Sequence, residues 1–182
     1  MYYLDFEACQ ELDTINGKYY INMIGLGWVK NNKWNYKCFF MKKLNGKEEI
    51  NIFKQFNKFI KNHSKNPIFV HWSNYEKTNY IRLKYKYNLT YYNFFDLCEF
   101  FIENGIVVKN SKNFKLKSVA NSMYNHNMIT TTWDTSITNG LDAMCDMFYM
   151  YKNNDFSNLQ SVIKYNEVDC KVMYDIIKYL TQ

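Results

Sequence analysis

The order of strand-like and helical segments is the feature that most limits what this chain can fold into. Strands are expected where apolar residues alternate or form short buried runs, at 2–6, 19–29, 33–41, 68–72 and 91–96. Helices are expected where apolar residues recur at helical spacing, at 49–62, 74–87, 97–101, 115–124, 139–151 and 158–180. Three strands followed by alternating helices and strands predict an α/β fold, a mixed sheet flanked by helices.

The length of 182 residues favours a single domain spanning 1–182. The chain shows no internal repeat, and its Asn and Lys clusters are too scattered to mark a linker. The polar stretch at 125–138 predicts a loop or lid between the helices of the last third.

The cysteines and apolar runs indicate the compartment. Five cysteines, an odd number, are widely spread without a CxxC pair, which disfavours a disulfide framework and a structural zinc site. Apolar runs fall short of the roughly 20 residues that a membrane-spanning helix needs, and the first residues do not resemble a signal peptide. We therefore expect a soluble intracellular protein in a reducing compartment, with no membrane partner.

The charge distribution is uneven, and its interpretation depends on a compositional bias. The chain has 22 Lys, 25 Asn and 17 Tyr but a single Arg, as an AT-rich coding sequence such as that of a virus or parasite would supply. Residues 30–86 carry 14 basic and 3 acidic side chains, whereas 1–29 and 118–182 each come to −3. This pattern fits a protein that binds phosphates beside a carboxylate cluster, and it equally fits a solvated Lys-rich surface produced by codon bias.

Asp5 and Glu7 are two residues apart on the first expected strand, so both carboxylates lie on one face while Leu4 and Phe6 lie on the other. Adjacent carboxylates in an apolar setting repel each other unless a cation lies between them. A hard divalent cation such as Mg²⁺ or Mn²⁺ suits these oxygen ligands. The alternative is an exposed strand face with two solvated acids.

Two further acidic residues, Asp169 and Glu76, lie in expected helices. Tyr165 and Asp169 are four residues apart, on one face of the helix at 158–180 and at the border of its apolar stripe. Glu76 comes early in the helix at 74–87, after an apolar strand. Each has a simpler interpretation: Asp169 as a surface acid, and Glu76 as a first-turn carboxylate favoured by the helix dipole.

Taken together, Asp5-Phe6-Glu7, the segment NYEKTNYI at 74–81 and the segment YNEVDC at 165–170 resemble the motifs of the DEDD 3′–5′ exonucleases of the ribonuclease H-like superfamily. The tyrosine points to the DEDDy branch. The segments at 70–83 and 165–170, with NFFDL and LKSVANSMY between them, are also similar to predicted RNase H-like nuclease domains found beside RecB-type nucleases. The resemblance covers nearly the whole chain, with the motifs in the family's order.

The resemblance implies a ribonuclease H-like fold and a metal-dependent 3′–5′ exonuclease that acts on DNA or RNA at a single-stranded 3′ end. It implies two Mg²⁺ or Mn²⁺ ions roughly 4 Å apart, and Tyr165 orienting the attacking water. Lysines of the basic middle would hold the nucleic-acid backbone. The implied metal ligands are Asp5, Glu7, Glu76 and Asp169.

One departure from the family concerns the second motif, which usually ends in Asp where this chain has Glu76. Asp96 is the competing acid, and we interpret it as the cap of a helix that starts at Leu97. If neither serves, the chain would be a catalytically silent nucleic-acid-binding or partner-docking module. A scaffold that binds no nucleic acid is a third alternative.

Overall fold

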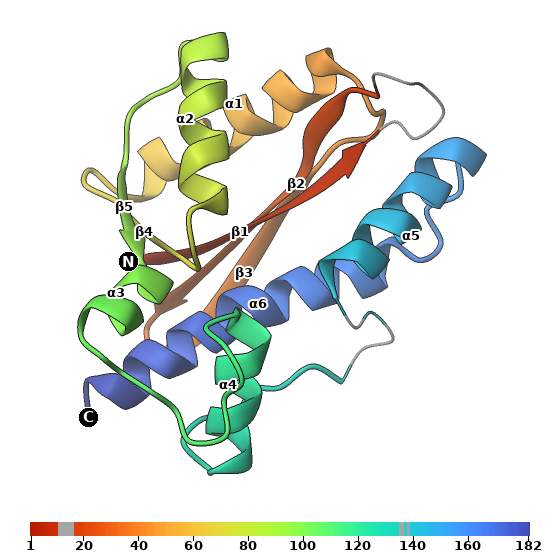
Figure 1. Cartoon of the computed structure of the whole chain (residues 1–182). Coiled ribbons are helices and arrows are strands. Elements are labelled where there is room, and N and C mark those ends of the chain that lie inside the picture. The colour runs from red at the N-terminus through yellow and green to blue at the C-terminus, as the bar shows by residue number, and fades with distance from the viewer. Residues whose placement is uncertain (11–16, 135–136, 138) are drawn as a thin grey trace.

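A computed structural model describes residues 1–10, 17–134, 137 and 139–182. Its centre is a five-stranded sheet in the order β3-β2-β1-β4-β5. The strands β1, β2 and β3 pair antiparallel, whereas β4 pairs parallel with β1 and β5 pairs parallel with β4 (Figure 1). The strands are β1 (Tyr2–Gln10), β2 (Tyr19–Lys30), β3 (Lys33–Phe40), β4 (Ile68–His71) and β5 (Asn93–Asp96).

The described residues also form six helices, and the expected single α/β domain with a mixed sheet and flanking helices is confirmed. In Figure 1, α1 and α2 lie on one side of the sheet, and α4, α5 and α6 lie on the other. None of the helices in the described part of the chain is long and apolar enough to cross a membrane. The helices are α1 (Gly46–His63), α2 (Tyr75–Tyr87), α3 (Leu97–Glu103), α4 (Leu116–Asn125), α5 (Gly140–Asn153) and α6 (Leu159–Leu180).

The loop expected at 125–138 is present where it is described. The helix α4 ends at Asn125, and residues 126–134 form turns and irregular backbone. Residues 135, 136 and 138 of this segment lie outside the described residues.

The strand β1 divides its side chains between two cores. Leu4 and Phe6 are buried with Phe53 of α1, on the side of the sheet that α1 and α2 cover. Tyr3 is buried with Val172 of α6 on the opposite side. Because side chains alternate along a strand, Asp5 and Glu7 share the face of Tyr3 and point toward α6.

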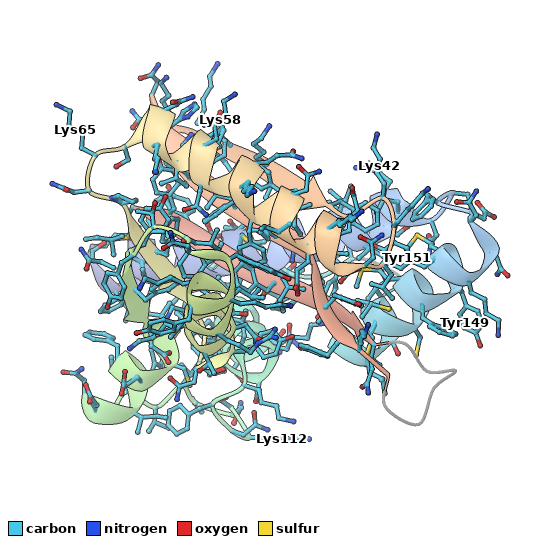
Figure 2. The ribbon with its side chains drawn as sticks, turned by 90° about the horizontal axis from the view of Figure 1, so that it is seen from above. Lys42, Lys58, Lys65, Lys112, Tyr149 and Tyr151 are labelled. Atoms are coloured by element: carbon cyan, nitrogen blue, oxygen red, sulfur yellow. The ribbon has the colours of Figure 1, made fainter. Side chains whose placement is uncertain are left out.

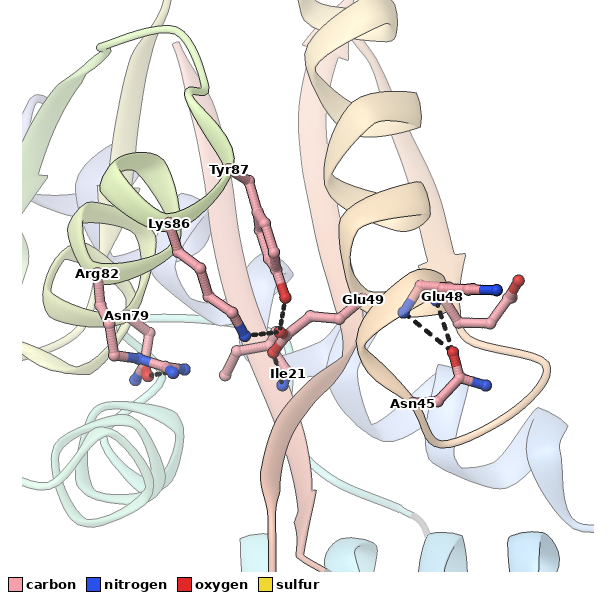
Figure 3. Close-up of polar contacts among 9 residues, drawn as sticks. Ile21, Asn45, Glu48, Glu49, Asn79, Arg82, Lys86 and Tyr87 are labelled. Carbon is pink, nitrogen blue, oxygen red and sulfur yellow. Dashed lines mark hydrogen bonds and ion pairs between the residues drawn. The ribbon is translucent and has the colours of Figure 1, made fainter.

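A β-bulge interrupts the pairing of β1 with β2 between Glu7 and Ala8. The backbone N–H of Ile21, which pairs with Ala8 beside this bulge, donates to a carboxylate oxygen of Glu49 at 3.0 Å. The hydroxyl of Tyr87 on α2 donates to the other oxygen of Glu49 at 2.7 Å (Figure 3). Glu49 therefore links α1 and α2 to β2 beside a bulge, and bulges bend a strand and re-aim its side chains.

Asp96 ends β5 and caps α3. Its carboxylate accepts the backbone N–H groups of Cys98 and Glu99, at 3.0 and 3.2 Å. It also accepts the N–H of Ser73 at 2.9 Å, which joins the start of α3 to the turn before α2. The interpretation of Asp96 as a helix cap is therefore confirmed.

Candidate metal centre

The fold brings together three carboxylates from the two ends of the chain. Asp5 and Glu7 come from β1, and Asp169 comes from α6, with one oxygen of each lying within 4.8 Å of the others. Glu7 and Asp169 are buried and Asp5 is partly exposed. Oxygen ligands at this mutual spacing suit a hard divalent cation such as Mg²⁺ or Mn²⁺.

The three carboxyl groups are poorly compensated when they are charged. Burial, followed by repulsion from Asp169 and Glu7, raises the pKa of Asp5 well above its ordinary value. Burial and the charge of Asp169 raise the pKa of Glu7 to about 8, and burial raises that of Asp169 to about 7. At neutral pH the cluster therefore retains protons, whose place a divalent cation can take. For this reason as well, the three carboxylates fit Mg²⁺ or Mn²⁺ as ligands.

Asn166 fixes the direction of the two β1 carboxylates. Its Nδ2 donates to Oδ2 of Asp5 at 2.5 Å and lies 3.4 Å from Oε1 of Glu7. Its Oδ1 accepts the hydroxyl of Tyr36 at 2.8 Å. A Cβ atom at Gly25 would lie 1.5 Å from that Oδ1, so α6 approaches β2 this closely only over a glycine. Sequence reasoning missed Asn166, although a glycine inside a buried strand signals such a close approach.

Asp169 is held by two donors. Nε1 of Trp133 donates to its Oδ1 at 2.8 Å, and the hydroxyl of Tyr165 donates to the same carboxylate, as the spacing of four on one helix face predicts. Both hydrogen bonds counteract the rise in the pKa of Asp169. Burial, with the charge of Asp169, raises the pKa of Tyr165, so the phenol stays protonated and serves as a donor. No feature of the sequence predicted the contact of Trp133.

Glu76 lies beside the three-carboxylate cluster and outside it. It is 4% exposed in the first turn of α2, and burial raises its pKa to about 8. Its carboxylate accepts the backbone N–H of Phe6, and its Oε2 lies 3.8 Å from Nδ1 of His71. The charge of Glu7 contributes to the rise in its pKa. Its role as a metal ligand stays a prediction.

Three lysines of the basic middle lie on the far side of the sheet from the carboxylates. Lys54, Lys58 and Lys61 are exposed along α1, which covers the sheet face opposite α6. Figure 2 shows Lys58 and Lys65 projecting outward from this side of the molecule. These α1 lysines therefore do not border the carboxylates, because the sheet lies between them.

A lysine from another part of the sequence reaches the cluster. Nζ of Lys117, on α4, lies 4.3 Å from the centre of the Tyr165 ring and 5.1 Å from that of Trp133. Partial burial lowers its pKa, although Asp169 and Glu7 act to raise it. The segment LKSVANSMY contains Lys117, yet nothing in its local pattern distinguishes this lysine from the others.

A cavity of about 310 Å³ opens next to Glu7. Tyr19 of β2 and Tyr75 of α2 form part of its wall, and their hydroxyl groups are hydrogen-bonded to each other. Leu141 and Met144 of α5 form another part. Glu7 thus borders a recess with aromatic and apolar sides.

The comparison with protein families agrees with this arrangement. The sequence profile of the RNase H superfamily matches residues 2–181, a span that contains both β1 with Asp5 and Glu7 and α6 with Asp169. A comparison with curated proteins gives no match. With a mixed five-stranded sheet, six helices and a match over nearly its full length, this chain belongs to the RNase H superfamily.

Proposed function

We propose that this protein is a metal-dependent 3′–5′ exonuclease of the DEDDy type, which hydrolyses phosphodiester bonds of DNA or RNA at a single-stranded 3′ end. The observation that carries the proposal is the cluster of Asp5, Glu7 and Asp169 with the Tyr165 hydroxyl on Asp169. Two Mg²⁺ or Mn²⁺ ions would be held by these carboxylates, and Glu76 is the proposed fourth acid.

The proposed reaction is the hydrolysis of the last phosphodiester. A water oxygen bonds to phosphorus, the bond from phosphorus to the 3′ oxygen of the penultimate nucleotide breaks, and that oxygen gains the proton that water loses. The products are a nucleoside 5′-monophosphate and a chain one nucleotide shorter with a 3′ hydroxyl. When bound, divalent ions activate the attacking water and stabilise the leaving oxygen.

The residues of the chain position these groups. Tyr165 acts through its protonated hydroxyl, which can hold the attacking water but cannot remove its proton at neutral pH. Asn166 and Trp133 keep Asp5 and Asp169 in one orientation through hydrogen bonds of 2.5 and 2.8 Å. Side chains that already have the correct orientation support catalysis, because they do not have to reorganise during the reaction.

The cavity beside Glu7 supports a nucleotide substrate. Its volume of about 310 Å³ is at the lower end of the range for small-molecule pockets. Bases of any sequence can stack on aromatic side chains, and Tyr19 and Tyr75 provide such a surface. We expect the terminal nucleoside to enter this recess.

The proposal is tested with single-stranded DNA and RNA carrying a 5′ label, incubated with Mg²⁺, Mn²⁺ or EDTA. A 3′–5′ exonuclease gives products that shorten one nucleotide at a time in Mg²⁺ or Mn²⁺ and no products in EDTA. A 3′-blocked substrate should resist, and Asp5→Ala should be inactive with its fold intact by circular dichroism. Absence of cleavage with either metal, or wild-type cleavage by Asp5→Ala, would reject the proposal.

A second candidate is an RNase H-like module that binds nucleic acid and does not cleave it. The observation in its favour is that Glu76, the proposed fourth acid, lies outside the group of three carboxylates. A silent module need not bind Mn²⁺, whereas the nuclease must. Calorimetric titration of the protein with Mn²⁺, compared with Asp169→Asn, separates the two candidates.

A further inference from the structure

Lys117 lies at the N-terminal end of a helix, a position that does not favour a positive charge. It lies in the first turn of α4, which begins at Leu116. The N-terminal end of a helix carries partial positive charge, which disfavours Lys at that position. The groups that Lys117 faces therefore matter more for its position than the end of the helix does.

Two aromatic rings face Lys117, and both belong to the metal centre. Its Nζ lies 4.3 Å from the centre of the Tyr165 ring and 5.1 Å from that of the Trp133 ring. Contacts of this length are favourable cation–π interactions. Because Tyr165 and Trp133 both donate hydrogen bonds to Asp169, the ammonium is held on the side of Asp169 where the attacking water is proposed to lie.

Lys117 lies among carboxyl groups, whose negative charge repels an incoming phosphate unless protons or divalent cations neutralise it. The charges of Asp169, Glu7, Asp142 and Asp5 all act on Lys117, which is partly withdrawn from water. A cation in a low-dielectric setting interacts more strongly with a nearby negative charge than an exposed one does. The lysines of α1 cannot take this part, since they lie across the sheet.

We propose that the Lys117 ammonium binds a non-bridging oxygen of the scissile phosphate, on the Tyr165 side of the carboxylates. The inference rests on the proposed nuclease function and adds to it a catalytic residue that the carboxylate motifs do not include. In phosphoryl transfer, charge is spread over the non-bridging oxygens of the transferred group, and positive groups held in place stabilise it. Lys117 supplies such a group from the protein itself.

The test compares Lys117→Met, which removes the charge and keeps most of the aliphatic stem, with Lys112→Met. Lys112 is exposed and projects outward in Figure 2, so it is the matched control. At saturating Mg²⁺ we expect Lys117→Met to lower kcat by about 10²–10³-fold, the usual loss for one such donor, with a much smaller change in KM. Lys112→Met should match the wild type.

Two further measurements report on the contact itself. With Rp and Sp phosphorothioates at the terminal linkage, the wild type should prefer one isomer in both Mg²⁺ and Mn²⁺, and Lys117→Met should lose that shared preference. In metal-free buffer, the plot of log K for single-stranded DNA against log salt should become shallower by about 0.7, the value for one phosphate contact. A purely structural lysine would change neither quantity.

A specific set of results would overturn the proposed role of Lys117. If Lys117 only balances the charge of the acids, Lys117→Met should bind Mn²⁺ more tightly and keep the wild-type kcat, isomer preference and salt slope, and this would overturn the proposal. If the wild type binds DNA and does not cleave it, the nuclease function fails, and the metal-free salt slope alone decides for or against Lys117. Should Lys117→Met unfold by circular dichroism, Lys117→Gln is measured in the same way.

Discussion

The side-chain amide of Asn166 donates to Oδ2 of Asp5 at 2.5 Å, so a residue of α6 sets the direction of the first carboxylate of β1. The two residues are 161 positions apart in the chain. The contact depends on Gly25, over which the Asn166 side chain packs. Because residues distant in the sequence hold Asp5 in place, the metal centre should be sensitive to substitutions at positions that carry no carboxylate.

Gly25→Ala should disrupt the metal centre through Asn166. The added Cβ would lie 1.5 Å from Oδ1 of Asn166, so that side chain must move away from Asp5. We expect a loss of about 1–3 kcal/mol in the free energy of unfolding, as for other overpacked cores, and weaker Mn²⁺ binding. Denaturant unfolding and calorimetry measure these two effects. Gly46→Ala is the control, because its Cβ would meet only Tyr87, at an ordinary 3.8 Å. Unchanged Mn²⁺ affinity in a folded Gly25→Ala would contradict the role of Asn166.

Tyr165→Phe should lower the rate of cleavage and leave metal binding nearly intact. The hydroxyl donates to Asp169, and the ring packs in the core at 4% exposure, so phenylalanine fills the same space. Losing a positioning group should slow single-turnover cleavage about 10²-fold or more. Mn²⁺ affinity, measured on the same preparation, should change little. If Tyr165→Phe cleaves at the wild-type rate, Tyr165 has no catalytic role and only the carboxylates of the proposed site remain.

Trp133→Phe should weaken metal binding in a pH-dependent way. The indole N–H donates to Oδ1 of Asp169 at 2.8 Å and helps to keep the pKa of that carboxyl from rising further. Without this donor the pKa of Asp169 should rise above about 7, so protons compete more strongly with Mn²⁺. Titrations at several pH values should show the affinity loss at neutral pH and its partial recovery at high pH. A loss of equal size at every pH would point to altered packing instead.

The stability of the metal-free protein should fall as the pH rises. Burial raises the pKa of Glu7 and Glu76 to about 8 from 4.5, and that of Asp169 to about 7 from 3.8. A folded-state pKa above the unfolded value stabilises the fold below the unfolded pKa, and this contribution is lost as pH rises through the folded pKa. Thermal unfolding with EDTA should therefore give a lower Tm at pH 9 than at pH 6.

Mn²⁺ should reverse that trend, because it takes the place of the protons. Its stabilising effect on Tm should be larger at pH 9 than at pH 6, and binding near neutral pH should release protons. Calorimetry in buffers of different ionisation enthalpy measures the proton release. Asp5→Ala should show a smaller decrease of Tm with pH, since it removes one of the repelling acids. A metal-free Tm that rises from pH 6 to pH 9 would be evidence against this electrostatic picture.

Substitutions of Glu76 should affect cleavage, whereas substitution of Asp96 should affect stability. We expect Glu76→Gln to lower cleavage strongly and Glu76→Asp to retain part of it, because Glu76 is the proposed motif-two acid. Asp96→Ala should cost about 0.5–2 kcal/mol of stability through the lost cap of α3 and keep the chemistry. Cleavage rates and unfolding curves of the three variants test the assignment. If Asp96→Ala abolishes cleavage in a stable protein while Glu76→Gln does not, the assignment is wrong.

Local sequence patterns were enough for the elements of the fold. The Asn31-Asn32 turn between β2 and β3 has φ values of 52° and 58° at its two residues, and asparagine tolerates such values better than most residues. Asp96 caps the helix that starts at Leu97, as its position and type predict. The pairing of Asp5 with Glu7 follows from the two-residue period of a strand. All of these depend on interactions over a few residues, which a sequence displays directly.

Contacts between distant segments were decided by the tertiary structure alone. Three contacts depend on how α6, α4 and α1 pack on the sheet. They are the hydrogen bond of Asn166 to Asp5, the position of Lys117 over Tyr165, and the hydrogen bond of Ile21 to Glu49. The α1 lysines of the basic stretch at 30–86 show the same limit, because the number of charges in a sequence does not tell which face of the sheet a helix will cover. The sequence by itself thus determined the elements and the acids at either end. Long-range packing, which joins groups with no local signature, decided which amide, lysine and indole surround those acids.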